Sequence, residues 1–299
     1  MQRVFLYIAL LLLLPSSISA QALNEAFLNS TVLISYVASP TASPAGSGFL
    51  VFKELKPKQG HIILVTNKHV LPSEGVEKSI NIRVNIKSGS STTVKLIQIP
   101  IVGKDGKYLP TIKMHPKSGY DIGVVNITEQ VLKESVSAEW LPLELFVTKE
   151  KLKAENITVG DEIFLLGYPA SIFDPRNVFP ILREGVIATV PSQGYAFNDT
   201  LKKQFGLPDQ IDGFLIDASV FPGSSGSVVI LKPQATTIGS QGETVVSSNK
   251  KIPYVLGIVS GSIPIADVAL GSVQRMGLGV VYSADAIKEA IDQLYPKTP

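Results

Sequence analysis

The sequence predicts an all-β protein with one helix at its C-terminal end. Three observations predict this class: about twelve short apolar runs, turn-forming residues between them, and helical spacing only near the end of the chain. The 299 residues include 24 Gly and 20 Pro, which suits many short strands and turns better than long helices. Many short strands of this kind are typical of a β-sandwich or a β-barrel.

The predicted strands are rich in Val, Ile and Phe and are bounded by Gly, Pro, Asn, Asp or Ser. They are Thr31–Val37, Gly48–Phe52, Ile62–Thr66, Ile80–Ile86, Thr93–Ile99, Ile122–Ile127, Glu162–Leu166, Gly185–Val190, Gly213–Ala218, Ser227–Leu231, Val255–Val259 and Gly279–Tyr282.

Three further segments follow other patterns. Ser283 can cap a helix over Ala284–Leu294, where apolar residues recur at helical spacing. The charged stretch Lys149–Glu155 is interpreted as a linker between two halves, and the polar insert Pro233–Lys251 as an exposed hairpin or loop.

Composition and charge exclude several classes of function. The chain has 27 Lys and Arg against 25 Asp and Glu, a net charge of +2, which argues against a nucleic-acid binder. It has no Cys, so disulfides, thiol catalysis and thiolate zinc sites are excluded. Its three His argue against a His-rich metal site, and we expect neither a metal nor an organic cofactor.

The N-terminal segment Met1–Ala22 has the order of a secretory signal peptide. Arg3 precedes the apolar run Val4–Leu14, and Ala20 and Ala22 form an A-x-A cleavage site. The alternative is a membrane anchor, but the apolar run covers only about half of a ~30 Å hydrocarbon core. We therefore expect a secreted or periplasmic chain without a stable membrane span. Export without cysteines is more typical of bacterial proteins.

The strongest local signal is the turn Pro222–Ser227, which leads into an apolar strand. Gly223 and Gly226 flank Ser225, and glycine permits backbone conformations that aim two N–H groups beside a serine hydroxyl. Acyl transfer needs a nucleophile beside donors for the developing oxyanion. An ordinary Gly/Ser turn is the alternative for this motif alone.

A serine hydroxyl needs an adjacent base, and His69 directly follows the apolar strand Ile62–Thr66. His61 and His115 are the competing histidines, but neither follows a strand in this way. Asp121 begins the apolar strand Ile122–Ile127, where a carboxylate could orient the imidazole. The competing acids Asp105 and Asp161 lack this context.

The three signals come in the order His, Asp, Ser, and here the sequence resembles the chymotrypsin-like (trypsin-fold) serine proteases. Within them it is similar to the bacterial trypsin-like peptidases that lack disulfides, including the HtrA/Deg and glutamyl-endopeptidase groups. The resemblance runs from about Ser30 to Tyr282 and rests on a combination of motifs. These are Ala45–Val51, Thr66–Val70, Asp121–Val125, Val159–Pro169, Gly223–Gly226 and Gly257–Ser260.

The resemblance implies a fold and a set of roles. The fold would be two packed six-stranded antiparallel β-barrels, 23–150 and 151–299, with the C-terminal helix after the second. Ser225 would attack a peptide bond, His69 would carry its proton, and Asp121 would orient His69. The backbone N–H groups of Gly223 and Ser225 would form the oxyanion hole.

The resemblance also implies substrate contacts. Ser260, Gly261 and Ser262 would pair with an extended polypeptide substrate as an added strand. Ser219 would lie at the base of the primary specificity pocket, and Gly261, Ser262 and the region Gly277–Gly279 would form its walls. The chain ends just after the last helix, which leaves no room for a C-terminal PDZ domain. The oligomeric state is not indicated.

Three departures from the family keep alternatives open. Ser224 stands where trypsin has the aspartate that receives the new N-terminal amine, so activation of that kind is not expected. Ser227 and Val228 replace the usual Gly-Pro after the serine motif. A malformed turn would make the chain a silent protein that binds extended peptides, or a latent enzyme that needs a partner. An esterase of the α/β-hydrolase type is disfavoured because its order is Ser, Asp, His.

Overall fold

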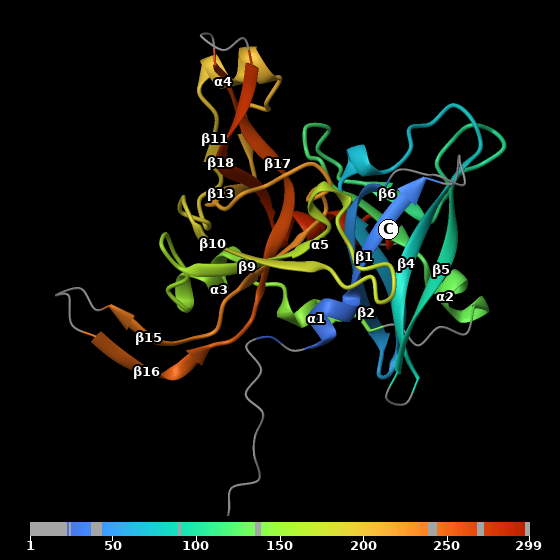
Figure 1. The fold of residues 1–299 in the computed structure, drawn as a ribbon, viewed down its shortest axis with the longest axis horizontal. Coiled ribbons are helices and arrows are strands. Elements are labelled where there is room, and N and C mark those ends of the chain that lie inside the picture. The colour runs from blue at the N-terminus through green and yellow to red at the C-terminus, as the bar shows by residue number, and fades with distance from the viewer. Residues whose placement is uncertain are drawn as a thin grey trace, which may run out of the picture.

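The computed structural model confirms the all-β class. It describes residue 23 and residues 25–36, 44–88, 91–134, 139–238, 244–267 and 272–296. Strands dominate these segments and gather into two β-structures that lie side by side, one from each half of the sequence (Figure 1). The predicted signal peptide, Met1–Ala22, lies outside the described residues.

The first half forms one sheet in the order β5-β4-β1-β2-β3-β7-β6, with β8 paired to β2. Tyr108 forms an isolated antiparallel bridge with Val102 at the end of β5. Its elements are α1 (Glu25–Ser30), β1 (Thr31–Tyr36), β2 (Pro44–Lys56), β3 (Gln59–Thr66), the 3₁₀ helix η1 (Lys68–Val70), β4 (Lys78–Ser88), β5 (Ser91–Val102), β6 (Ile112–Met114), β7 (Gly123–Asn126), α2 (Thr128–Lys133), β8 (Leu141–Pro142) and η2 (Leu143–Leu145).

The second half forms a closed barrel in the order β10-β13-β18-β17-β14-β9. The pairs β11-β12 and β15-β16 stand outside it. Its elements are α3 (Lys149–Ala154), β9 (Glu162–Gly167), the 3₁₀ helix η3 (Pro169–Ser171), β10 (Ile181–Ile187), β11 (Tyr195–Ala196), α4 (Asp199–Phe205), β12 (Gln210–Ile211), β13 (Gly213–Asp217), β14 (Val228–Leu231), β15 (Gln234–Ile238), β16 (Thr244–Lys251), β17 (Val255–Asp267), β18 (Ser272–Ser283) and α5 (Ala284–Asp292).

Strands β2 and β3 are buried on both faces, which explains why their sequences are continuously apolar. Side chains alternate between the faces of a strand. Leu50 and Leu64 therefore join the core inside the first sheet, while Phe49 and Val65 join a second core. One pair of strands thus supplies two hydrophobic cores.

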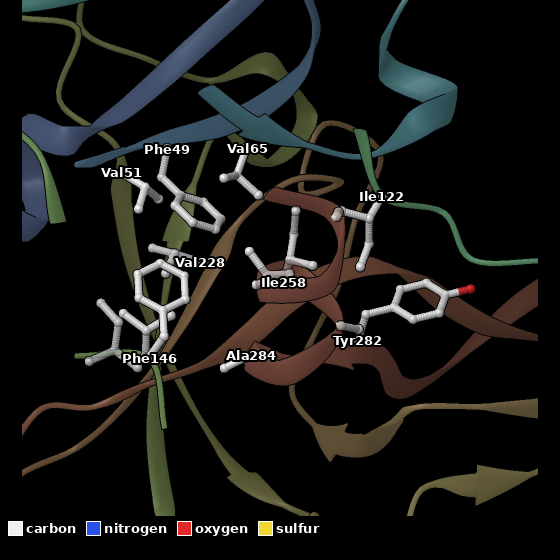
Figure 2. Packing of buried hydrophobic residues seen from close by; sticks show 14 of the residues in the cluster. Phe49, Val51, Val65, Ile122, Phe146, Val228, Ile258, Tyr282 and Ala284 are labelled. Atoms are coloured by element: carbon white, nitrogen blue, oxygen red, sulfur yellow. The ribbon is translucent and has the colours of Figure 1, made fainter. Parts of the chain in front are cut away.

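The second core lies between the two halves and joins them. Figure 2 shows Phe49 and Val65 from the first half facing Val228 and Ile258 from the second. Helix α5 contributes Ala284 and further buried residues to the same cluster. A separate core fills the closed barrel, with Phe214 fully buried there. Burial of these apolar surfaces is the main free energy that docks one half against the other.

The expected two-barrel fold with a C-terminal helix is confirmed, with differences in detail. Every predicted strand overlaps an observed one, and Pro233–Lys251 contains the β15-β16 hairpin, which projects from the barrel in Figure 1. The predicted strand Gly185–Val190 is displaced, because β10 spans Ile181–Ile187. The first sheet differs from a regular six-stranded barrel, since β8 branches from β2. The chain crosses to the second barrel between β8 and β9, and a boundary at 150 stays a prediction.

The stretch interpreted as a linker, Lys149–Glu155, lies in the connection between β8 of the first half and β9 of the second, and it contains helix α3, which was not predicted. Thr148 caps this helix, since its side chain accepts a hydrogen bond from the N–H of Lys151. Leu152 is buried in the core of the closed barrel. The many charged residues of this stretch did not suggest a helix, but the buried Leu152 and the Thr148 cap are sufficient to form a short one.

Helix α5 begins where the sequence predicted and ends at Asp292. The Ser283 side chain accepts from the N–H of Ala286, and the apolar face is buried between the two halves. The described residues also form four short α-helices, α1 to α4, and three 3₁₀ helices that were not predicted, because few residues in them repeat at helical spacing. Among the described helices, none is long and apolar enough to cross a membrane.

The core between the halves predicts a large cost for Leu166→Ala. Leu166 is fully buried in this cluster, and such a truncation typically costs about 2–5 kcal/mol of unfolding free energy. Leu132→Ala is the matched control, because that side chain is 71% exposed. Denaturant unfolding of both variants checks this, and equal losses would contradict the packing assigned to Leu166.

Candidate active site

His69 is positioned by the end of strand β3. The chain leaves β3 at Thr66 and makes the short helix η1, in which Val70 is buried and anchors the turn. The side chain of His69 is 52% exposed, so its outer nitrogen is accessible to a substrate. The side-chain amide of Asn67 donates to the carbonyl of Asp121 at 2.7 Å, which ties the histidine turn to the aspartate loop.

Asp121 receives three hydrogen bonds, and two of them come from His69. Oδ1 accepts from the backbone N–H of His69 at 3.0 Å, and Oδ2 lies 2.6 Å from His69 Nδ1. The hydroxyl of Ser260 donates to Oδ2 at 2.7 Å. Because a carboxylate only accepts, Nδ1 carries the proton and Nε2 keeps a free lone pair. This is the tautomer that a general base requires.

The loop before Asp121 is held by aromatic side chains. Tyr120 packs against Tyr282 with ring centroids 5.3 Å apart, and the Tyr282 hydroxyl donates to the carbonyl of Gly119. Burial raises the pKa of Tyr282 to about 12, so this phenol stays a neutral donor.

Ser225 lies in the turn between β13 and β14, at the rim of the closed barrel. Gly223 and Gly226 both have φ of +87°, which only glycine adopts readily. A Cβ at Gly226 would lie 1.8 Å from the carbonyl oxygen of Ser47, so no other residue fits there. The turn predicted from the glycine spacing is therefore present.

The hydroxyl of Ser225 donates to the carbonyl of Ser260 at 3.0 Å. Within the described residues, no hydrogen bond joins it to His69. Ser260 thus contacts both Asp121 and Ser225, through its hydroxyl and its carbonyl respectively. His69, Asp121 and Ser225, which are far apart in sequence, meet around this one residue.

Neither the N–H of Gly223 nor that of Ser225 has an acceptor in the described part of the chain. Ser224 is buried, and its hydroxyl accepts from the N–H of Phe221 at 3.3 Å. It therefore supports the turn from within, and the two amides remain available for an oxyanion.

The predicted substrate-binding residues line the neighbouring strands. Ser260, Gly261 and Ser262 lie on β17, and Ser262 pairs with Gly279 of β18. A Cβ at Gly261 would meet nothing within 4 Å, so the space above it is open. A Cβ at Gly279 would lie 2.8 Å from Val220, whose side chain is buried.

Ser219 is exposed, and its carbonyl accepts a hydrogen bond from Arg183. The neighbouring Val220, together with Ile216, occupies the space beneath Gly279. Sequence reasoning missed both residues, because an offset from Ser225 cannot tell which of two consecutive side chains turns inward.

A cavity of about 1020 Å³ lies beside His69 and Asp121. It is lined only by residues of the first half, among them Tyr36, Leu71 and Tyr108.

The competing histidines lie elsewhere. His61 Nδ1 is 2.8 Å from the Tyr295 hydroxyl. The buried His115 stacks on Tyr120, and its Nε2 faces Glu289 at 3.2 Å. Burial lowers the pKa of His115, which keeps the ring neutral. In the described segments, no three His, Asp or Glu side chains cluster as metal ligands would.

Solved structures with a similar arrangement include two of Rv3671c from M. tuberculosis H37Rv. One is the crystal structure of an inactive form of a serine-to-alanine mutant, with 18% identity and a TM-score of 0.46, covering 92% of this chain and 90% of that one. The other is the Rv3671c protease in an inactive form, with 18% identity and a TM-score of 0.47, covering 91% of each chain. Among curated proteins, none matches the sequence.

The sequence profile of the trypsin-like peptidase domain matches residues 46–239. This match spans more than half of the chain and includes His69, Asp121 and Ser225. It confirms the resemblance to the chymotrypsin-like serine proteases. The chain therefore belongs to the trypsin-like peptidase family and is a peptidase of the serine type.

Proposed function

We propose that the chain is an exported serine endopeptidase that uses His69, Asp121 and Ser225 as a catalytic triad. The observation that carries the proposal is the double contact between Asp121 and His69, through the backbone N–H and through Nδ1. It fixes both the position and the tautomer of the imidazole. Nε2 is then left as the base that a serine nucleophile needs.

In the proposed reaction, rotation about the Cα–Cβ bond of Ser225 moves its hydroxyl from the Ser260 carbonyl toward His69 Nε2. The oxygen attacks the scissile carbonyl while Nε2 takes the proton. The oxyanion accepts from the N–H groups of Gly223 and Ser225. His69 then gives the proton to the leaving amine, which departs as the acyl-enzyme forms. Water next attacks the acyl group while His69 Nε2 takes a proton from it. His69 then returns this proton to the Ser225 oxygen as the acyl group leaves.

One observation favours a second candidate, a protein that binds extended peptides without cutting them. The Ser225 hydroxyl donates to the Ser260 carbonyl instead of to His69. If that bond persisted with a peptide on β17, the nucleophile would stay inactive. A latent enzyme that needs a partner would give the same result until the partner binds.

Labelling with a fluorophosphonate probe tests the triad. We expect the chain from residue 23 to react, and Ser225→Ala and His69→Ala to lose labelling, because removing either group typically costs about 10⁶ in turnover. Asp121→Asn should lower peptide hydrolysis by about 10⁴ through the wrong imidazole tautomer. His61→Ala is the matched histidine control, because His61 contacts Tyr295 and lies away from the triad, and it should label normally.

Absence of labelling in the folded wild-type chain would overturn the proposal. Peptide binding by that unlabelled chain would then support the silent peptide-binding protein. Labelling that appears only after a partner protein is added would instead support the latent enzyme.

The space beneath Gly279 predicts a preference for small apolar residues before the cleaved bond. Val220 and Ile216 fill this space with apolar atoms. Val220→Ala should enlarge the pocket and shift kcat/KM from Ala and Val toward Leu and Phe. Profiling a peptide library with both proteins checks this, with Val76→Ala as the control because Val76 is 63% exposed. An unchanged profile would contradict the assignment.

Export is proposed from the order of charges and apolar residues in Met1–Ala22. Expression of the full chain in a bacterial host should yield a product that begins at residue 23, as measured by intact mass. Ala20→Asp should block this processing because cleavage needs small residues, whereas Gln21→Glu should not. A membrane-bound product that still begins at Met1 would support the anchor instead.

A further inference from the structure

Ser47 connects the first half of the molecule directly to the turn that carries Ser225. It lies on β2, and its side chain is fully buried. Its hydroxyl donates to the carbonyl of Gly223 at 2.8 Å and accepts from the N–H of Tyr168 at 2.9 Å. Its own N–H donates to the carbonyl of Ser225 at 2.8 Å. One small residue therefore holds two peptide groups of the turn.

Every carbonyl from Pro222 to Ser225 is held by a donor. In addition to the two bonds from Ser47, the Pro222 carbonyl accepts from Ala170 at 2.6 Å, and the Ser224 carbonyl accepts from Ser227 at 3.0 Å. The C=O and N–H of a trans peptide point in opposite directions. Holding the carbonyls of Pro222 and Ser224 thus orients the N–H groups of Gly223 and Ser225.

The bond from Ser47 to the Gly223 carbonyl fixes the peptide that links these two donors. The N–H of this linking peptide, on Ser224, donates inward to the carbonyl of Phe221 at 2.9 Å. The relative direction of the two oxyanion donors therefore depends on the hydroxyl of Ser47. In the described residues, no other side chain donates to a carbonyl of this turn.

The packing around Ser47 leaves little freedom for the turn to move. A Cβ at Gly223 would lie 2.4 Å from the Tyr168 carbonyl, and one at Gly167 would lie 2.8 Å from the Ser47 hydroxyl. Ala170 and Ser171 have φ of +50° and +60°, conformations that persist only where the surroundings impose them. The Thr66 hydroxyl in turn holds the Ser47 carbonyl at 2.7 Å.

We propose that Ser47 is a positioning residue that preforms the oxyanion hole across the boundary between the two halves. The inference rests on the proposed function, and it adds that the turn is ready for catalysis in the resting chain without a partner. A serine suits the position because the site needs a donor and an acceptor on one small buried group. Alanine would leave the carbonyl of Gly223 and the N–H of Tyr168 without partners.

The test compares Ser47→Ala with Ser30→Ala. Ser30 is a fully buried serine of the same half whose hydroxyl donates to the carbonyl of Phe27, remote from the turn. Both variants lose a buried hydrogen bond, so both should lower Tm. Deleting an oxyanion donor costs about 10²–10³ in kcat, so misaligning one in Ser47→Ala should cost about 10- to 100-fold. KM should stay unchanged, and Ser30→Ala should keep the wild-type kcat.

A second measurement distinguishes misalignment of the oxyanion hole from a disturbance of the whole substrate-binding site. A peptide aldehyde forms a tetrahedral adduct whose oxygen occupies the hole, whereas a non-cleavable peptide analogue binds only along β17. In Ser47→Ala we expect weaker inhibition by the aldehyde, in proportion to the loss of kcat, and unchanged affinity for the analogue. If Ser47→Ala does not fold, Ser47→Cys serves instead, since a thiol has similar size and only weak hydrogen bonds.

Three results would overturn the proposal. If the wild-type enzyme is active and Ser47→Ala has the same kcat, Ser47 does not position the oxyanion hole, while the proposed function is still supported. Equal losses of affinity for aldehyde and analogue would show that the whole cleft is disturbed. An unreactive wild-type chain would overturn both the preformed hole and the proposed function.

Discussion

The docking of two β-structures through one shared hydrophobic core is the constraint on which the other features depend. Strands β2 and β3 cannot bury both faces within a single sheet, because alternate side chains such as Leu50 and Phe49 point in opposite directions. The outward set is satisfied only by a second apolar surface, which β9, β14 and β17 supply. Each half therefore has a set of apolar residues that only the other half covers.

The polar residues of the active site lie at the rim of this core, each within a few residues of a packed side chain. Thr66 follows Val65, Asp121 precedes Ile122, and Ser47 lies two residues before Phe49. Close packing fixes the positions of the apolar residues to within fractions of an ångström. The hydrogen-bonding groups at the rim are held in position by these packed neighbours, whereas a surface loop would leave them free to move. Apolar burial thus supplies the free energy that docks the two halves, and the polar contacts orient the side chains at the rim.

One carboxylate and two glycines contribute to the geometry of this site in different ways. Asp121 is partly buried, and its charge is stabilised by three donors, two from His69 and one from Ser260. The glycines allow backbone to approach backbone where any side chain would collide, as at Gly226 against Ser47. The carbonyls of the resulting turn are hydrogen-bonded, and the N–H groups of Gly223 and Ser225 have no acceptor among the described residues.

The sequence by itself determined the strands and the last helix, and it indicated His69, Asp121 and Ser225 as candidate residues, because apolar runs and motif residues are local patterns. It did not reveal the helix within Lys149–Glu155, where one cap and one buried Leu outweigh the charges. Only the tertiary structure decided which segments meet. That Val220 rather than Ser219 turns inward, and that Ser47 holds the Ser225 turn, depends on contacts between residues far apart in the chain. Such contacts are fixed by how the two halves pack, and no local spacing encodes them.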